Sequence, residues 1–302
     1  MKPRIPRNFF FYWSGQDFLY VHYLSIHSLL ATNTVKRCEI YCRVEPIGNL
    51  YWEKLKQSHD IEIIPLDFDA LFAQAGIKPD QCGLWRRPDL KENHLSDIFR
   101  YLILKCHGGI YIDFDMIIAK DFAPLLETEF FVGFQQAGGR VPLNGAVMGA
   151  APEALALDLC LRGVCDYLKK AKTVSSIGCG PELLSRLLIR PLFLFLGKWG
   201  LAVSKRFSLR AMGPDTRFEV CPPSYFYPVP WHQWWRIFQP HPLPAETYAL
   251  HLWGSKSHHH LRQVGPGYVR HDPSLLAVTL RRSLGADINL LSPGRTEHEV
   301  LV

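Results

Sequence analysis

The stretch SDIFRYLILKCHGGIYIDFD, residues 96–115, decides the fold of this 302-residue chain. Its apolar spacing predicts an amphipathic helix, its Gly-Gly pair a turn, and its GGIYI run a short buried strand. Two acids, Asp113 and Asp115, then follow on either side of Phe114. Because alternate side chains of an extended backbone point to the same face, we expect both carboxylates to lie together where the strand leaves the core.

Two carboxylates at the end of a strand suit a divalent cation that also holds phosphate oxygens. The preceding helix adds Asp97 and Arg100, which are three residues apart and therefore lie on one face. Taken singly, an Asp-x-Asp sequence is weak, an Asp-Arg pair is typical of a helix surface, and Gly108-Gly109 is typical of a helix end. Their order and spacing together indicate a site.

Strand and helix patterns alternate on the amino-terminal side of this stretch. The predicted elements are strands at 9–13, 38–44 and 61–66, with helices at 18–31 and 50–59. Such alternation is typical of an α/β domain with a parallel sheet covered by helices on both faces. Ligands of such sheets bind beyond the carboxyl ends of the strands, so we expect Trp13 and Asp113 to meet in one cleft.

The carboxyl-terminal half is more irregular. We interpret residues 1–285 as a single domain, with 175–245 an insertion on the acceptor or membrane side and 286–302 a loose tail. The apolar run LFLFLGKWGLAV at 192–203 has two interpretations. It is either a buried hairpin-like insertion or, with the basic residues around it, part of a peripheral membrane contact through 191–210.

Composition narrows the classes of function. The chain is 48% hydrophobic and 21% charged, which allows a sizeable core, and its net charge is +6. This mild positive excess fits an anionic substrate or a negatively charged membrane face. It is too small and too scattered to indicate a nucleic-acid partner.

The eight cysteines predict a reducing compartment. None forms a Cys-x-x-Cys pair, and several lie inside apolar runs, so we interpret them as reduced and mostly buried. The apolar run near the first residue is too short for a signal peptide, and no run reaches the length of a membrane-spanning helix. We therefore expect a cytoplasmic protein, with any membrane contact peripheral and at the inner face.

Residues 96–115 resemble the signature of the glycosyltransferases that have a sugar-binding region with a DXD motif. This family includes capsular-polysaccharide, yeast α-mannosyltransferase-like and α-1,4-galactosyltransferase-like enzymes, and is glycosyltransferase family 32-like. The positions that match are Ser96, Asp97, Arg100, Tyr101, Leu104, Gly108, Gly109, Tyr111, Asp113 and Asp115. The resemblance implies a GT-A fold, which is a Rossmann-like mixed sheet flanked by helices.

A second match to the family lies in YALHLWGSKS, residues 248–257. Relatives carry His-x-Trp at the end of a strand, usually with Ser and Trp soon after, and these groups hold the pyrophosphate and complete the metal shell. The residues that match are His251, Trp253 and Ser255. No second Trp follows, so the third contact stays open between Ser255, Lys256 and Ser257. Without the DXD motif, a strand histidine such as His251 is usually a core residue.

The resemblance also implies roles for Trp13 and Asn144. In relatives, an aromatic residue at the end of the first strand packs on the nucleobase, which implies that role for Trp13; its alternative is a core aromatic. Relatives also place an asparagine before a strand, where it contacts the donor sugar or the acceptor, and Asn144 matches it. The alternative for Asn144 is a turn residue, because Asn-Gly is a strong turn pair.

The resemblance implies a metal-dependent retaining transfer of a hexose or N-acetylhexosamine. The donor is expected to be a UDP-linked sugar, and the acceptor a hydroxyl of a surface glycan such as lipopolysaccharide or capsule. Asp115, supported by Asp113 and His251, would hold Mn²⁺ or Mg²⁺. Arg100 would hold a sugar or phosphate oxygen, and Asp97 would accept sugar hydroxyls.

Two other classes of function stay open. One is a non-catalytic module on the same fold that binds a sugar nucleotide or a glycan. The other is a metal-dependent phosphohydrolase, although such enzymes usually use more acids and histidines to hold two metals. The oligomeric state is not indicated by the sequence.

Overall fold

The computed structural model describes residues 4–78, 83–135, 143–189, 207–208 and 218–285. The tail at 286–302 and nearly all of the segment 191–210 therefore lie outside the described residues. Among the described helices, none combines the length and the apolar character that crossing a bilayer requires.

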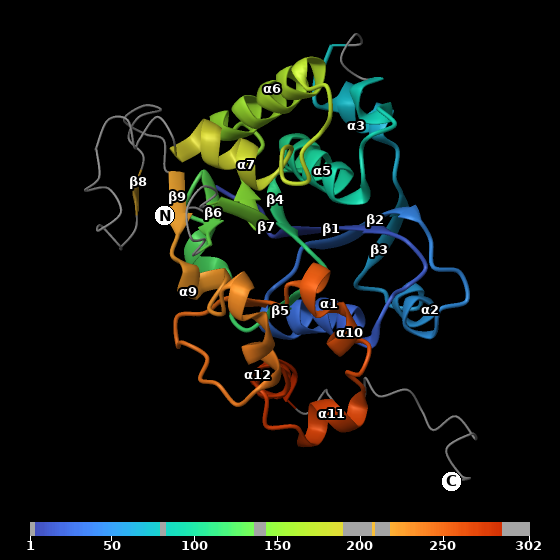
Figure 1. Ribbon diagram of the computed structural model, residues 1–302, viewed down its shortest axis with the longest axis vertical. Coiled ribbons are helices and arrows are strands. Elements are labelled where there is room, and N and C mark those ends of the chain that lie inside the picture. Colours follow the sequence, from blue (N-terminus) through green and yellow to red (C-terminus); the bar gives the residue numbers. More distant parts are fainter. Residues whose placement is uncertain (1–3, 79–82, 136–142, 190–206, 209–217, 286–302) are drawn as a thin grey trace.

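A mixed sheet lies at the centre of the molecule (Figure 1). In the described residues it has eight strands in the order β3-β2-β1-β4-β7-β6-β9-β8. The strands are β1 (Asn8–Ser14), β2 (Arg37–Val44), β3 (Glu62–Pro65), β4 (Gly109–Ile112), β6 (Phe130–Phe134), β7 (Leu143–Ala150), β8 (Phe207–Ser208) and β9 (Phe218–Cys221). The first four are parallel and β7 runs against β4, which confirms the predicted α/β class.

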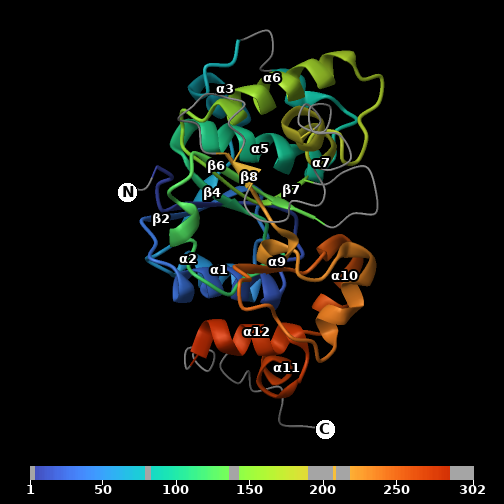
Figure 2. The same cartoon turned by 90° about the vertical axis from the view of Figure 1, so that its left-hand side faces the viewer.

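Helices cover both faces of this sheet. The longer helices are α1 (Tyr20–Thr32), α2 (Leu50–Lys56), α3 (Phe68–Gln74), α5 (Glu92–His107), α6 (Leu155–Lys170), α10 (Gly254–Leu261) and α12 (Leu275–Leu284). The shorter ones include α7 (Pro181–Leu184), α9 (Pro223–Phe226) and α11 (Pro266–His271). Figure 2 shows α3, α5, α6 and α7 on one side of the sheet and α1, α11 and α12 on the other.

The composition of β1 reflects these two layers. Its continuous aromatic run is buried on both faces, as expected of a central parallel strand. Phe9 and Phe11 point into the core on the α1 side, whereas Phe10 and Tyr12 pack in the core on the α5 side. A strand with one solvated face would instead alternate apolar with polar side chains.

A second, two-stranded sheet joins distant parts of the chain. In it β5 (Met116–Ile118) pairs antiparallel with β10 (Ala249–His251), and His251 lies opposite Met116. Asp113, Phe114 and Asp115 form the turn between β4 and β5 rather than the end of a single strand. This pairing brings the second family match beside the two acids.

Two local expectations need correction or refinement. The Gly-Ser sequence after Trp253 predicts a loop, but this prediction is wrong, because residues from Gly254 onward form the helix α10. Part of the predicted insertion 175–245 also belongs to the central sheet, since β9 pairs in parallel with β6.

Gly109 is required where α5 turns into β4. Its φ is +128°, and an added Cβ would collide with the carbonyl oxygen of Asn8. We predict that Gly109→Ala lowers the free energy of unfolding by about 2–4 kcal/mol, because backbone strain and a clash with rigid main chain add together. Urea unfolding would measure this change.

Gly76→Ala is the matched control. Gly76 has a φ of +71° but open space around it, so only the strain of about 1 kcal/mol applies. Equal losses in the two variants would contradict the role of close packing at Gly109.

Candidate active site

Helix α5 carries a buried ion pair into the centre of the site. Asp97 and Arg100 are 5% and 4% exposed, which excludes the surface-pair interpretation. Arg100 Nη2 lies 3.1 Å from Asp97 Oδ1 and 3.4 Å from Asp113 Oδ1. The guanidinium also packs over the ring of Tyr111, 4.6 Å from its centroid. Gly145 makes room for it, since a Cβ there would lie 2.8 Å from Nη1.

Asp113 is fixed by groups from three elements. The hydroxyl of Tyr111 in β4 donates to its carboxylate and is itself within 2.7 Å of Ser96 Oγ on α5. The backbone amide of Asp113 donates to the carbonyl of Ala146 in β7. Burial raises the pKa of Asp113, and Arg100 partly opposes this rise. A nearby cation would therefore stabilise the ionised carboxylate further.

Asp115 is held by the segment that contains β10 and α10. Its Oδ1 lies 3.2 Å from Nε2 of His251, and its Oδ2 accepts a hydrogen bond of 2.7 Å from the Gly254 amide. Burial would raise the pKa of Asp115, but His251 and the Gly254 amide lower it to about 2. The carboxylate is therefore ionised at neutral pH.

The two acids and His251 fit a divalent cation. One ligand atom from each of the three residues lies within 4.8 Å of the others. Nε2 of His251 faces Asp115 at 3.2 Å, so it is the ring nitrogen that would reach a cation between the acids. Carboxylate oxygens with one imidazole suit Mn²⁺, and Mg²⁺ is also compatible with the oxygen ligands.

Trp13 lies beside this cluster. Its ring is partly exposed and sits 5.3 Å from the ring of Phe114, the residue between the two acids. Phe18 and His22 contact its other sides, and its Nε1–H donates to the carbonyl of Gly15. Trp13 is therefore packed against the core and still presents part of its surface at the carboxyl end of β1.

Asn144 occupies a strand position rather than a turn. It is the second residue of β7, and its side chain accepts from the amide of Ala146 and donates to Gln135. Its backbone carbonyl accepts from the hydroxyl of Tyr227, whose ring lies 5.5 Å from His251. This network places Asn144 on the side of the site opposite α5.

The residues after His251 have distinct positions. Trp253 is 7% exposed, donates to the carbonyl of Val229, and is the only described non-glycine residue with positive φ, at 56°. Its side chain is therefore engaged in the core, and its left-handed backbone sets the direction in which the chain enters α10. Ser257 is fully buried and donates to the backbone, whereas Ser255 and Lys256 are exposed at the start of α10. Of the three candidates for the third contact, Ser255 and Lys256 are therefore the two that are exposed to solvent.

Two groups of the site were missed from the sequence. The amide of Gly254 binds Asp115, and Tyr227 packs on His251. Gly180, which with Pro181 resembles the family's Gly-Pro helix start, lies against the carboxylate of Asp97, where a Cβ would collide with it. No local pattern marks Tyr227, because its role depends on a non-local contact.

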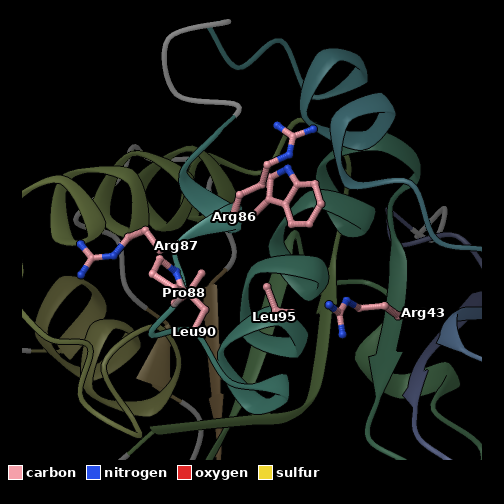
Figure 3. A pocket seen from close by; sticks show the side chains of 7 residues that line it. Arg43, Arg86, Arg87, Pro88, Leu90 and Leu95 are labelled. Carbon is pink, nitrogen blue, oxygen red and sulfur yellow. The ribbon is translucent and has the colours of Figure 1, made fainter.

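A cavity of about 360 Å³ opens between the short helix η1 (Gly83–Arg86) and the start of α5 (Figure 3). Its lining residues are Arg43, Trp85, Arg86, Arg87, Pro88, Leu90 and Leu95. Its three arginines form the ion pairs Arg43–Glu92, Arg86–Asp69 and Arg87–Asp89. Because each guanidinium already has a carboxylate partner and none of the predicted site residues lines it, we do not assign the donor to this cavity.

Comparison with known proteins agrees with this geometry. The glycosyltransferase sugar-binding region containing DXD motif matches residues 69–132, and the alpha 1,4-glycosyltransferase conserved region matches residues 203–271. Lactosylceramide 4-alpha-galactosyltransferase of Pongo pygmaeus is 30% identical over 207 residues, covering 66% of this chain and 84% of that protein. The chain belongs to this glycosyltransferase family.

Other relatives differ in length or are more distant. The Homo sapiens protein of the same name is 30% identical over 66% of this chain and 52% of its own, so the chain spans about half the length of that relative. Alpha-1,4-N-acetylglucosaminyltransferase of Homo sapiens is 26% identical over 62% of this chain and 48% of its own.

A solved structure supports the fold. The WbbM bifunctional glycosyltransferase in its apo form superposes with a TM-score of 0.52 at 7% identity, covering 94% of this chain and 51% of that one. At this identity the similarity concerns the fold alone. Together with the strand order, it confirms the expected GT-A arrangement.

We predict that Asp115→Asn weakens Mn²⁺ binding at least roughly tenfold, because it removes one of two carboxylates from the cluster. Electron paramagnetic resonance of free Mn²⁺ during a titration would measure the change. Asp17→Asn is the matched control, since Asp17 is an exposed carboxylate that contacts α10 through His258 and Arg262. Equal affinity in Asp115→Asn and the parent protein would contradict the assignment.

The pKa of Asp97 predicts that the free energy of unfolding depends on pH. Burial is the main reason that the pKa of Asp97 rises from 3.8 to about 7, with Arg100 opposing the rise. Between these two pKa values the folded protein keeps a proton on Asp97 that the unfolded chain loses. The contribution of Asp97 to the free energy of unfolding is therefore complete below pH 3.8 and is lost as the pH rises through 7.

We expect Asp97→Asn to remove this dependence. From pH 4.5 to 7.5, the free energy of unfolding of the variant should rise relative to the parent protein by on the order of 1–3 kcal/mol. Urea titrations at both pH values would measure the difference. A difference that does not change with pH would contradict the raised pKa.

Proposed function

We propose that this protein transfers a sugar from a nucleotide diphosphate donor to a hydroxyl of a saccharide, with a divalent cation held by Asp113, Asp115 and His251. The observation that carries the proposal is the convergence of these three residues, with their ligand atoms within 4.8 Å, from the β4–β5 turn and from β10. A bound Mn²⁺ or Mg²⁺ would supply positive charge for the departing diphosphate.

The start of α10 is suited to the diphosphate. The amide of Gly254, its first residue, donates to Asp115, and a helix amino terminus favours anions. Ser255 and Lys256 are exposed there and can donate to phosphate oxygens. We propose that Trp13, whose ring lies 5.3 Å from that of Phe114, packs on the nucleobase, which the family resemblance suggests is uracil.

We propose that Asp97 and Arg100 bind the donor sugar. Both are buried beside Asp113, and buried groups that bind hydroxyls discriminate strongly against a sugar that leaves them unpaired. The names of the relatives specify α-4 transfer of galactose and of N-acetylglucosamine, which supports a hexose or an N-acetylhexosamine as the transferred group.

We further propose that the anomeric configuration is retained. Among the described residues of the site, the carboxylates of Asp97, Asp113 and Asp115 each pair with Arg100, Tyr111 or His251. None is thus available as a covalent nucleophile. Attack by the acceptor hydroxyl on the face that the diphosphate leaves is therefore the route we favour.

We propose a surface glycan such as lipopolysaccharide or capsule as the acceptor, extended on the cytoplasmic side of a membrane. The support is the composition and the resemblance of the sequence, and a peripheral contact through 191–210 remains a prediction.

The site favours a transferase over the two alternatives. A phosphohydrolase with two metals needs more ligands than the one cluster of three found among the described residues. A non-catalytic binding module would have no need of the connected set of Asp97, Arg100 and Asp113, which is complete here.

A donor screen tests the proposal. The protein is incubated with UDP-galactose, UDP-glucose, their N-acetylamino forms and GDP-mannose in the presence of Mn²⁺, and the released nucleoside diphosphate is measured. We expect release from at least one UDP-sugar, its loss with EDTA, and a fall of at least roughly 100-fold in Asp113→Asn but not in Asp17→Asn. Binding of donors without release would favour the module, and hydrolysis of phosphate monoesters would favour the phosphohydrolase.

A further inference from the structure

The 3₁₀ helix η6 (Trp231–Phe238) exposes two tryptophans. Trp231 is 44% and Trp235 is 47% exposed, whereas Trp234 of the same helix packs on Phe238 and His260. A large aromatic side chain in contact with water forgoes a substantial hydrophobic gain. Such a residue is therefore informative where it stands beside a binding site.

Trp231 follows a segment that contacts the residues of the cation cluster. Two residues before it, the carbonyl of Val229 accepts from Nε1 of Trp253, and the ring of Trp253 lies 4.1 Å from that of His251. Tyr227, on the same segment, contacts His251 from another side. The segment that ends in Trp231 is thus fixed to the residues that hold the cation.

Lys256 connects Trp231 with the proposed diphosphate site. Its Nζ lies 5.9 Å from the centroid of the Trp231 ring, and it follows by two residues Gly254, whose amide binds Asp115. A cation–π contact at this distance between exposed groups is weak, so a sugar ring can replace the ammonium. Lys256 is then free to move toward phosphate oxygens.

We propose that Trp231 is the stacking platform for the acceptor sugar, a role that rests on the proposed function. The indole suits a pyranose that presents one face made of C–H groups. In galactose, the axial O4 leaves the opposite face with the C–H groups of C3, C4 and C5. A galactose ring stacked through that face points O4 away from the indole, which fixes its orientation.

Trp231 would position the acceptor hydroxyl for the proposed sugar transfer. The acceptor oxygen forms a bond to the anomeric carbon of the donor while the bond from that carbon to the diphosphate oxygen breaks. The electron pair leaves with the diphosphate, and the proton of the acceptor hydroxyl passes to a phosphate oxygen. Trp231 acts here by orienting the acceptor and is not a participant in the proton transfer.

Binding of p-nitrophenyl β-D-galactoside tests this role directly. The glycoside is titrated calorimetrically into the protein in the presence of UDP and Mn²⁺, and UDP affinity is measured separately. We expect Trp231→Ala to lower the affinity for the glycoside about tenfold while its affinity for UDP stays within twofold. Trp231→Phe should lose less, because it keeps an aromatic face.

Trp235→Ala is the matched control, since Trp235 is equally exposed in the same helix and its ring contacts Trp234. It should bind the glycoside as the parent protein does. Three outcomes would overturn the proposal: Trp231→Ala binds the glycoside within twofold of the parent protein, both variants lose affinity equally, or the parent protein does not bind the glycoside at all.

A lipid surface is the competing occupant, and it gives a different result. The measurement is sedimentation with phosphatidylcholine–phosphatidylserine vesicles. If Trp231→Ala and Trp235→Ala lower this sedimentation equally, and neither lowers glycoside binding, the acceptor role of Trp231 is overturned. If glycoside binding depends on Trp231 but the parent protein releases UDP from no donor, the result supports the acceptor-binding role of Trp231 and contradicts the proposed sugar transfer.

Discussion

The pairing of β10 with β5 is the interaction on which the site depends. Only three residues of each strand pair, and His251 lies opposite Met116. This register places the imidazole beside Asp115 and starts α10 so that the Gly254 amide also reaches that carboxylate. If the register slipped by one residue, His251 would point to the opposite face and the cluster would lose its only described nitrogen ligand.

Charge explains why this arrangement needs a ligand. Three buried or partly buried carboxylates, those of Asp97, Asp113 and Asp115, share the single guanidinium of Arg100 and the imidazole of His251. Burying carboxylates without compensating charge is costly, and the raised pKa of Asp97 and of Asp113 expresses that cost. The divalent cation that we propose at the two acids would offset the excess, and a diphosphate would then bring its own negative charge to it.

The sequence predicted the parts of this account that depend on local patterns. The aromatic run of β1, the helix α5 and the acids after β4 follow from apolar spacing, and the pairing of Asp97 with Arg100 follows from the motif, although its burial does not. The turn at Asp113–Asp115, the helix after Trp253 and the contacts of Tyr227 did not follow, since they arise where distant segments meet. The left-handed backbone at Trp253 illustrates this limit, because the local sequence alone would not favour φ of 56° for tryptophan.

Anomalous diffraction tests the central claim most directly. Crystals grown with Mn²⁺ and UDP, measured near the manganese edge, should give an anomalous peak at roughly 2.2 Å from a carboxylate oxygen of Asp115, with Asp113 or His251 in the same shell. The diphosphate should complete the coordination from the side of α10. A peak elsewhere, or UDP bound with no manganese between it and Asp115, would contradict the account.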